Sequence, residues 1–183
     1  MADPLALLCR LPRAEDLVAQ ARRRAGLADF GATPFSEALE VLLTSCREEA
    51  DLSLFGRFAI RWDSVRFLSN LLRLRAEELQ APEILDLPIE RPILIAGLPR
   101  SGTTFLHSLL AEDPANLVPR VWQLIHPYPA RPAGADRRPQ RVARQLRLFA
   151  MLAPEFRRLH PIAADSPQEC SEITAHVFAS QRR

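Results

Sequence analysis

The sequence predicts an α/β protein with a P-loop-like, three-layer parallel sheet, preceded by a helical N-terminal region. Three patterns predict this class. Apolar residues recur at helical spacing through most of the first ninety residues, and a short run rich in β-branched residues follows at 93–96. Directly after that run, Gly97 and Gly102 bracket four residues, and a further helical pattern begins. We therefore expect a helical region at 1–88 and the first part of an α/β domain at 89–183.

Composition and charge exclude several classes of protein. The chain has 183 residues, of which 48% are hydrophobic, enough for one domain with a sizeable core. Its net charge of +2 comes from 24 basic and 22 acidic residues, and it lacks the concentrated positive field of a nucleic-acid-binding protein. The N-terminal apolar run is soon broken by arginine and proline, so it is too short for a signal sequence or a transmembrane segment.

The cysteines indicate a reducing compartment. They are Cys9, Cys46 and Cys170, an odd number at wide spacing, which fits neither a disulfide framework nor a metal site. We therefore expect a cytoplasmic protein without a nucleic-acid partner, and the sequence leaves its oligomeric state open.

The N-terminal region begins with two helical patterns. Residues 16–25 have helical spacing and are followed by Gly26, a residue typical of helix C-termini. A second helix is expected after Thr33, which can cap it ahead of Pro34. These boundaries predict two short helices.

A longer helical pattern covers residues 52–79. Gly56 and Asp63 lie within it, and both predict a break into shorter helices. The apolar stripes of all these helices are typical of a protein core, and the alternative is a surface that binds a partner.

Shorter elements are expected in the second half of the chain. They are a proline-bounded connector at 82–88, a strand at 93–96, an edge strand or loop at 117–122, a proline-rich loop at 128–134, and helices at 137–152 and from Pro167 towards Ser180. The run at 93–96 is uniformly apolar, so we expect a central parallel strand buried on both faces.

The segment from Gly97 to Thr104 predicts a phosphate-binding loop. Gly102 lets the backbone approach phosphate oxygens closely, and the first N–H groups of the following helix point at the anion. Where nucleoside triphosphatases have a lysine, this chain has Thr103, and Arg100 supplies the positive charge. The alternative is a plain turn whose hydroxyls only cap the helix. The agreement of strand, loop, arginine and helix favours phosphate binding.

The sequence PRSGTT after a short apolar strand resembles the 5′-phosphosulfate loop of sulfotransferases. Similarity to a bacterial sulfotransferase family extends to GLADFGATPFSEALEVLL, PEILDLPIERPILIAG, FLHSLLAEDP and SPQECSEITAHVFAS. The resemblance implies metal-free transfer of a sulfuryl group from 3′-phosphoadenosine 5′-phosphosulfate (PAPS) to a hydroxyl or amine of a small molecule. The implied cofactor-binding residues are Pro99, Arg100, Ser101, Gly102, Thr103 and Thr104.

The sequence offers two candidates for a catalytic base. Relatives often have Trp-Glu after the loop helix, whereas this chain has Trp122 and Gln123, and glutamine takes up no proton at neutral pH. His160 remains, at a separation from the loop similar to that of the histidine in cytosolic sulfotransferases, and so does Glu169. Each has a structural alternative, which for Glu169 is a capping box that begins at Ser166.

The chain has few strands for a doubly wound sheet, and its fold is apparently truncated. Relatives hold the cofactor's 3′-phosphate with an arginine and a serine well downstream of the loop, and no such element precedes Arg183. We therefore expect an N-terminal portion of a sulfotransferase that is inactive by itself. The alternatives are a P-loop kinase-like nucleotide binder, which the missing lysine disfavours, and a non-catalytic helical interaction module, which Gln123 favours.

Overall fold

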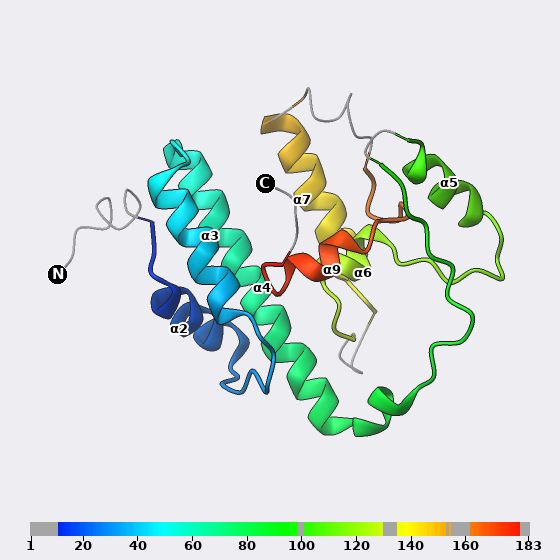
Figure 1. The fold of residues 1–183 in the computed structure, drawn as a ribbon, viewed down its shortest axis with the longest axis horizontal. Helices are drawn as coiled ribbons and strands as arrows, with labels where there is room; N and C mark the ends of the chain where they lie inside the picture. Colours follow the sequence, from blue (N-terminus) through cyan, green and yellow to red (C-terminus); the bar gives the residue numbers. More distant parts are fainter. Residues whose placement is uncertain (1–10, 99–100, 130–134, 153, 155–161, 180–183) are drawn as a thin grey trace. The chain divides into compact units, whose positions relative to one another are not determined.

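A computed structural model describes residues 11–98, 101–129, 135–152, 154 and 162–179 of the chain (Figure 1). These residues form two compact units. The first lies within Met1–Leu85 together with Ile173–Arg183, and the second lies within Asp86–Glu172. Each unit is described separately.

The first unit is built from three helices, α2 (Ala14–Ala25), α3 (Ser36–Glu48) and α4 (Leu54–Gln80). α2 ends as the sequence predicts, because Gly26 adopts a left-handed conformation with φ of 69°. Its N–H group donates to the carbonyl of Arg22, which closes the last turn.

The apolar faces of these helices meet in one core. Its fully buried side chains come from all three helices and include Leu17, Leu39, Leu43, Val65, Leu68 and Leu72. Burying each leucine contributes about 1.5–3 kcal/mol of hydrophobic free energy. Most of the predicted stripes are therefore core. The first half of α4 is different, because Phe55 and Phe58 remain more than half exposed.

The predicted break in the third helical pattern is wrong, because α4 is continuous over 27 residues. Gly56 lies in its first turn, where the Ser53 hydroxyl accepts the glycine N–H at 3.2 Å. A glycine at this position caps the helix instead of weakening its interior. Asp63 is paired with Arg66, one turn later, at 3.0 Å.

The start of α3 also differs from the prediction. The helix begins at Ser36, with Phe35 as its N-cap, instead of directly after Thr33. The Phe35 ring lies 4.6 Å from the Phe30 ring, between centroids, and this contact fixes the chain just before the helix.

The 3-10 helix η1 (Pro82–Asp86) follows α4 in sequence and lies almost entirely within the first unit. The described residues of the second unit include three α-helices, α5 (Thr103–Leu110), α6 (Val121–Ile125) and α7 (Arg138–Leu152). η1 occupies the predicted connector, and α7 matches the helix predicted there. Val121, Val142 and Ala164 form a small buried cluster between α6, α7 and the segment before Ser166.

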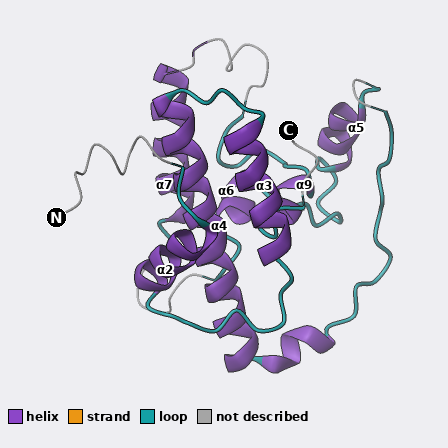
Figure 2. Cartoon of the chain, turned by 60° about the vertical axis from the view of Figure 1, so that its left-hand side comes forward, coloured by secondary structure: helices purple, strands orange, loops and turns teal. Residues whose placement is uncertain are grey.

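The predicted parallel sheet is not seen in the described residues, where Figure 2 shows only helix and loop. Residues 93–96 have no regular structure, and Ile93 and Leu94 are 60% and 88% exposed. A β-strand needs neighbouring strands for its backbone hydrogen bonds, and the described part of the chain offers none to this run. The expectation of a buried strand is therefore not met.

At 117–122, where the sequence leaves an edge strand or a loop open, the structure has a loop that leads into α6. Leu117 is 99% exposed, and α6 begins at Val121. A single antiparallel bridge joins Arg120 to Pro167. Pro119 lies directly before that bridge, and a proline that cannot donate a ladder hydrogen bond limits pairing to an isolated contact.

The last predicted helix is shorter and starts later. α9 covers Ser171–Ala175 and is followed by a turn. The helix cannot begin at Ser166 or Pro167, because both are held in an extended contact with the segment before α6. The Ser166 hydroxyl accepts the Ala163 N–H at 3.1 Å, so it caps no helix.

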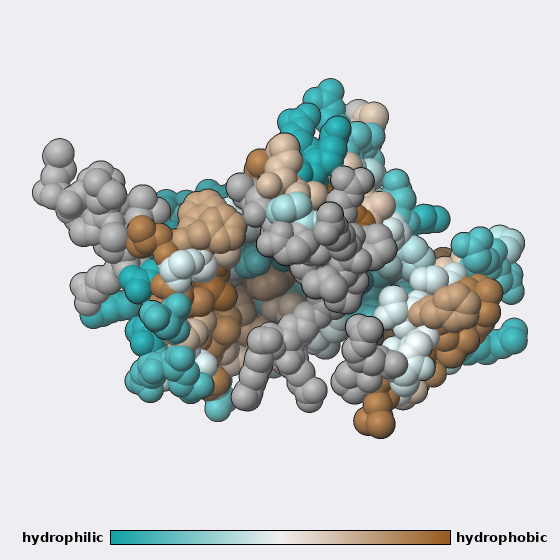
Figure 3. Space-filling model, turned by 90° about the horizontal axis from the view of Figure 1, so that it is seen from above, coloured by the Kyte–Doolittle hydropathy of each residue, from teal (hydrophilic) through white to brown (hydrophobic). Residues whose placement is uncertain are grey.

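Apolar side chains are prominent on the described surface (Figure 3). Those of the second unit include Ile93, Leu94, Leu98, Phe105, Leu106 and Leu109. α5 has no buried residue. No helix within the described ranges has the length and apolar character needed to cross a bilayer.

Candidate functional site

The loop before α5 forms a tight turn. The Ser101 N–H donates to the Leu98 carbonyl at 3.1 Å. Gly102 follows with φ of 88°, a left-handed conformation that side chains rarely adopt, and the helix begins at Thr103. Pro99 and Arg100, which the sequence assigns to the same loop, lie outside the described residues.

The two glycines of the loop have different surroundings. A Cβ atom at Gly97 would lie 2.7 Å from the Ser101 Oγ and 2.8 Å from the Thr103 Cγ2. The side chains of Ser101 and Thr103 therefore pack on Gly97, and a larger residue there would force them to shift. A Cβ at Gly102 would have no atom within 4 Å. The loop is closed at its first glycine and open to a ligand at its second.

The N-terminus of α5 has the chemistry of an anion site. The first N–H groups of a helix have no partner within the helix, and the helix dipole makes this end positive. The N-cap, Gly102, has no side chain that could accept from these N–H groups. The side chains of Ser101 and Thr104 are exposed beside it. Backbone N–H groups and two hydroxyls can therefore donate to one oxyanion.

Glu169 lies at this loop. The Thr104 hydroxyl donates to its Oε1 at 3.1 Å, across 65 residues of sequence. The structure thus brings together one predicted base and one predicted cofactor-binding residue. The predicted capping box is wrong, because α9 begins only at Ser171, two residues after Glu169.

Contacts to the segment before α6 hold the chain near Glu169. The Val121 N–H donates to the Ser166 carbonyl, and the Gln168 N–H donates to the Pro119 carbonyl, both at 3.0 Å. The Arg120 guanidinium donates to the Asp165 carbonyl at 2.7 Å. The sequence analysis missed Arg120, because its partner is 45 residues away and no local pattern marks it.

Gln123, at the position where relatives often have glutamate, has a structural role. Its Oε1 accepts the Arg120 N–H at 2.8 Å. The side chain thereby reaches back over the first turn of α6, as the third helical residue of a capping box does. A glutamate could accept the same hydrogen bond.

Of the two histidines considered as possible bases, only His107 lies within the described residues. His107 is half-buried on α5, one turn after Thr103. His160 lies outside the described residues. Only Glu169 among the two predicted bases can be placed at the loop.

Arg138 connects α6 and α7. It pairs with Asp136 at 2.8 Å, donates to the carbonyls of His126 and Tyr128, and lies 4.8 Å from the centre of the Trp122 ring. Its hydrogen bonds hold the pKa of Asp136 below the usual range of an aspartate. This partly buried arginine supports the unit that contains the loop.

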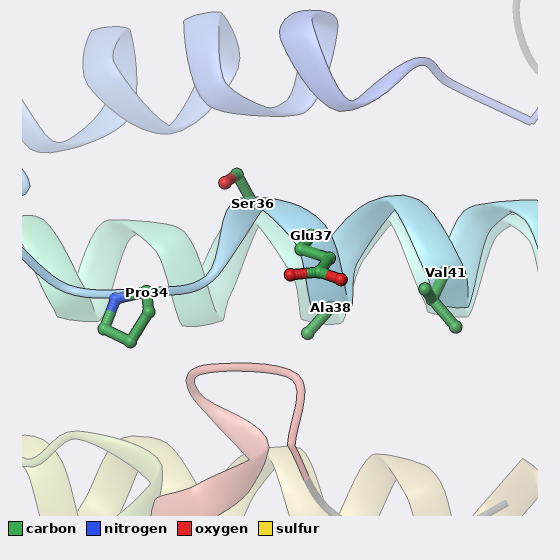
Figure 4. Close-up of a pocket in the computed structure, with 5 residues that line it drawn as sticks. All are labelled: Pro34, Ser36, Glu37, Ala38 and Val41. Carbon is green, nitrogen blue, oxygen red and sulfur yellow. The ribbon is translucent and has the colours of Figure 1, made fainter.

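A shallow hollow in the first unit lies beside the start of α3 (Figure 4). Pro34, Ser36, Glu37, Ala38 and Val41 line it. It offers one carboxylate and no basic group, so it does not suit a phosphorylated ligand. Within the described ranges, no group of three or more histidine, cysteine or acidic side chains could hold a metal ion.

The turn that opens α5 has the geometry of the anion-binding loops of nucleotide-dependent α/β proteins. Residues 92–182 match the model of a family described as the sulfotransferase family. Together with two solved bacterial structures, this match shows that the chain belongs to the sulfotransferase family. The resemblance noted from the sequence is therefore confirmed.

The two structures come from mycobacteria. Sulfotransferase STF1 from Mycobacterium tuberculosis H37Rv is 30% identical with a TM-score of 0.69, and the match covers 92% of this chain and 47% of that one. Sulfotransferase STF9 from Mycobacterium avium is 29% identical with a TM-score of 0.78, and the match covers 91% and 44%. The chain thus spans less than half the length of either. A search of curated proteins found no match.

These relatives imply a P-loop-like α/β fold for the family to which the chain belongs. The sheet itself does not appear in the described residues. The predicted fold class is therefore supported at the level of the family.

Proposed function

We propose that the chain supplies the 5′-phosphosulfate loop of an enzyme that transfers a sulfuryl group from PAPS to a hydroxyl or amine of a small molecule. One observation carries this proposal. Inside the family match, Gly102 opens α5 in a left-handed conformation with free space in front of it, and Glu169 reaches the adjacent Thr104.

The loop fits the phosphosulfate group. Gly97 lets the loop close on Ser101 and Thr103, while Gly102 leaves room for oxygens against the backbone. The hydroxyls of Ser101 and Thr104 and the first N–H groups of α5 can donate to the phosphosulfate group. Arg100 can neutralise the charge of that group. The proposed ligand set is Pro99, Arg100, Ser101, Gly102, Thr103 and Thr104.

PAPS, when bound, supplies the activated sulfuryl group. Negative charge develops on the 5′-phosphate as its bond to the sulfuryl group breaks. The hydrogen-bond donors of the loop stabilise this charge, so they serve catalysis as well as binding. Their geometry is set before binding by the turn at Gly102. The proposed mechanism uses no metal ion.

We propose Glu169 as the group that accepts the acceptor's proton. Its carboxylate lies 3.1 Å from the Thr104 hydroxyl, so an ionisable group lies beside the proposed phosphosulfate loop. His160 is the alternative base, and a His160→Ala substitution in the same assays tests it.

We base proposals for the domain bounds, for the activity of the chain alone and for its location on this function. We propose a helical region at 1–88 beside the first part of the PAPS-binding domain at 89–183, with no transferase activity by the chain alone. Cys46 and Cys170 are both free thiols, which supports a cytoplasmic location.

Isothermal titration of the chain with PAPS tests the proposal. We expect binding without Mg²⁺, and a loss of at least about tenfold in affinity for Arg100→Ala, because a charged hydrogen bond to the anion disappears. Arg147→Ala, on the exposed side of α7, is the matched control. Binding that requires Mg²⁺ and prefers ATP would instead favour a kinase-like protein.

A further inference from the structure

We propose that Glu169 occupies the anion position of the loop while the donor is absent, so that the donor binds by displacing its carboxylate from Thr104. This inference rests on the proposed function of the loop. It gives Glu169 a second role, which precedes its role in proton transfer.

The contact has the chemistry of an anion site that is already filled. Thr104 is the second residue of α5, so its hydroxyl lies in the first turn, where the helix dipole favours negative charge. The group that accepts from this hydroxyl is a carboxylate, at 3.1 Å. Carboxylates, phosphates and sulfates present the same kind of acceptor oxygens to such donors.

The carboxylate is held near the loop by the backbone around it. The residue before it, Gln168, donates its N–H to Pro119, and the Glu169 carbonyl accepts the Glu172 N–H at 3.4 Å. The segment therefore enters α9 from a fixed contact with the chain before α6.

Two anions cannot share this position. A hydroxyl has one proton to donate, so the Thr104 hydroxyl must leave Glu169 before it can donate to a phosphosulfate oxygen. The two negative charges would also repel each other. The carboxylate that is displaced is the one we propose as the base, so donor binding frees it for the acceptor. This exchange predicts that the donor binds before the acceptor.

The test compares PAPS affinity of the full chain and of Glu169→Gln by isothermal titration. Glutamine keeps a hydrogen-bond acceptor for Thr104 but has no charge. We expect the variant to bind PAPS about threefold to tenfold more tightly at low ionic strength, and the gain to shrink at high salt. Circular dichroism verifies that both proteins are folded.

Two further variants make the result specific. Glu112→Gln removes the same charge just beyond the C-terminal end of α5, and we expect unchanged affinity. In a Thr104→Val background, where the carboxylate has lost the hydrogen bond from Thr104, the gain from Glu169→Gln should be smaller than in the native chain.

The possible outcomes distinguish a failure of this inference from a failure of the proposed function. Equal or weaker binding by Glu169→Gln, with normal binding by the native chain, would overturn the displacement and leave the phosphosulfate loop in place. An equal gain in PAPS affinity for Glu112→Gln would show that the gain comes from the net charge of the chain. That result would also overturn the displacement. Failure of every variant to bind PAPS would overturn the proposed function, and this inference with it.

Discussion

Asn70 and His176 lie 2.9 Å apart, from the Asn70 Nδ2 to the His176 Nε2, although 106 residues separate them in sequence. Both side chains are buried, and the imidazole also contacts the Phe67 ring edge to face at 5.0 Å. An amide nitrogen donates, so the imidazole is the acceptor. The bond ties the chain after α9 to the middle of α4.

Replacing Asn70 with alanine should destabilise the first unit. The buried imidazole would lose this partner, at a cost of about 1–3 kcal/mol in the free energy of unfolding. Urea denaturation followed by circular dichroism measures this value. Gln140→Ala, on the exposed surface of α7, should change it little. Equal stability of Asn70→Ala and native chain would show that the contact contributes nothing.

Replacing Gly97 with alanine should disrupt the loop. The new Cβ would lie under 3 Å from side-chain atoms of both Ser101 and Thr103, so these two loop side chains must leave their positions. Strain of about 1–3 kcal/mol in the binding form of the loop corresponds to a loss of about fivefold to a hundredfold in PAPS affinity. Ala96→Gly, one residue earlier, is the control for a change in the same segment. Native affinity in Gly97→Ala would contradict the packing of the loop on this glycine.

Stability should depend on pH through Asp136. Arg138 lowers the pKa of this carboxyl, so the pair stabilises the folded chain above the usual aspartate pKa of about 3.9. The contribution is lost as the pH falls through the lowered pKa of the folded state. We expect the stability difference between native chain and Asp136→Asn to be largest near neutral pH.

Urea denaturation at neutral pH and at several acidic values measures that difference. Asp51→Asn, in the other unit, controls for the loss of one charge. A difference that stays constant into strong acid would contradict the assignment to the Asp136–Arg138 pair.

Gln123 should stabilise α6 rather than take part in chemistry. Gln123→Ala removes the side chain that accepts the Arg120 N–H, and should cost about 0.5–1 kcal/mol. Gln123→Glu should keep the stability, because a carboxylate accepts the same bond. Thermal unfolding compares the three proteins. A stability loss in Gln123→Glu equal to that in Gln123→Ala would rule out this capping role.

Local signals predicted part of the fold from the sequence. Gly26 ends α2 and Gly102 precedes α5, because a left-handed residue at a helix end is a property of one glycine and its neighbours. The continuity of α4 was missed, since the sequence does not tell whether Gly56 falls in a first turn or in a helix interior. That distinction depends on where Ser53 caps the helix.

Long-range contacts set the features that the sequence could not predict. Residues 93–96 have strand-forming side chains, but a strand exists only where other strands pair with it. The bridge of Arg120 with Pro167 removes the predicted start of the last helix, and no local pattern reveals it. Glu169 was selected by its residue type, whereas its contact with Thr104 depends on chain packing across 65 residues.

The exposed run that includes Ile93 and Leu94 also limits how the chain can be handled. Apolar side chains that are 60% and 88% exposed, on a run without regular structure, offer hydrophobic area to another molecule. Self-association of this kind grows with concentration, so dilute solutions should scatter light least. A Leu94→Glu substitution should raise the solubility limit without touching the loop.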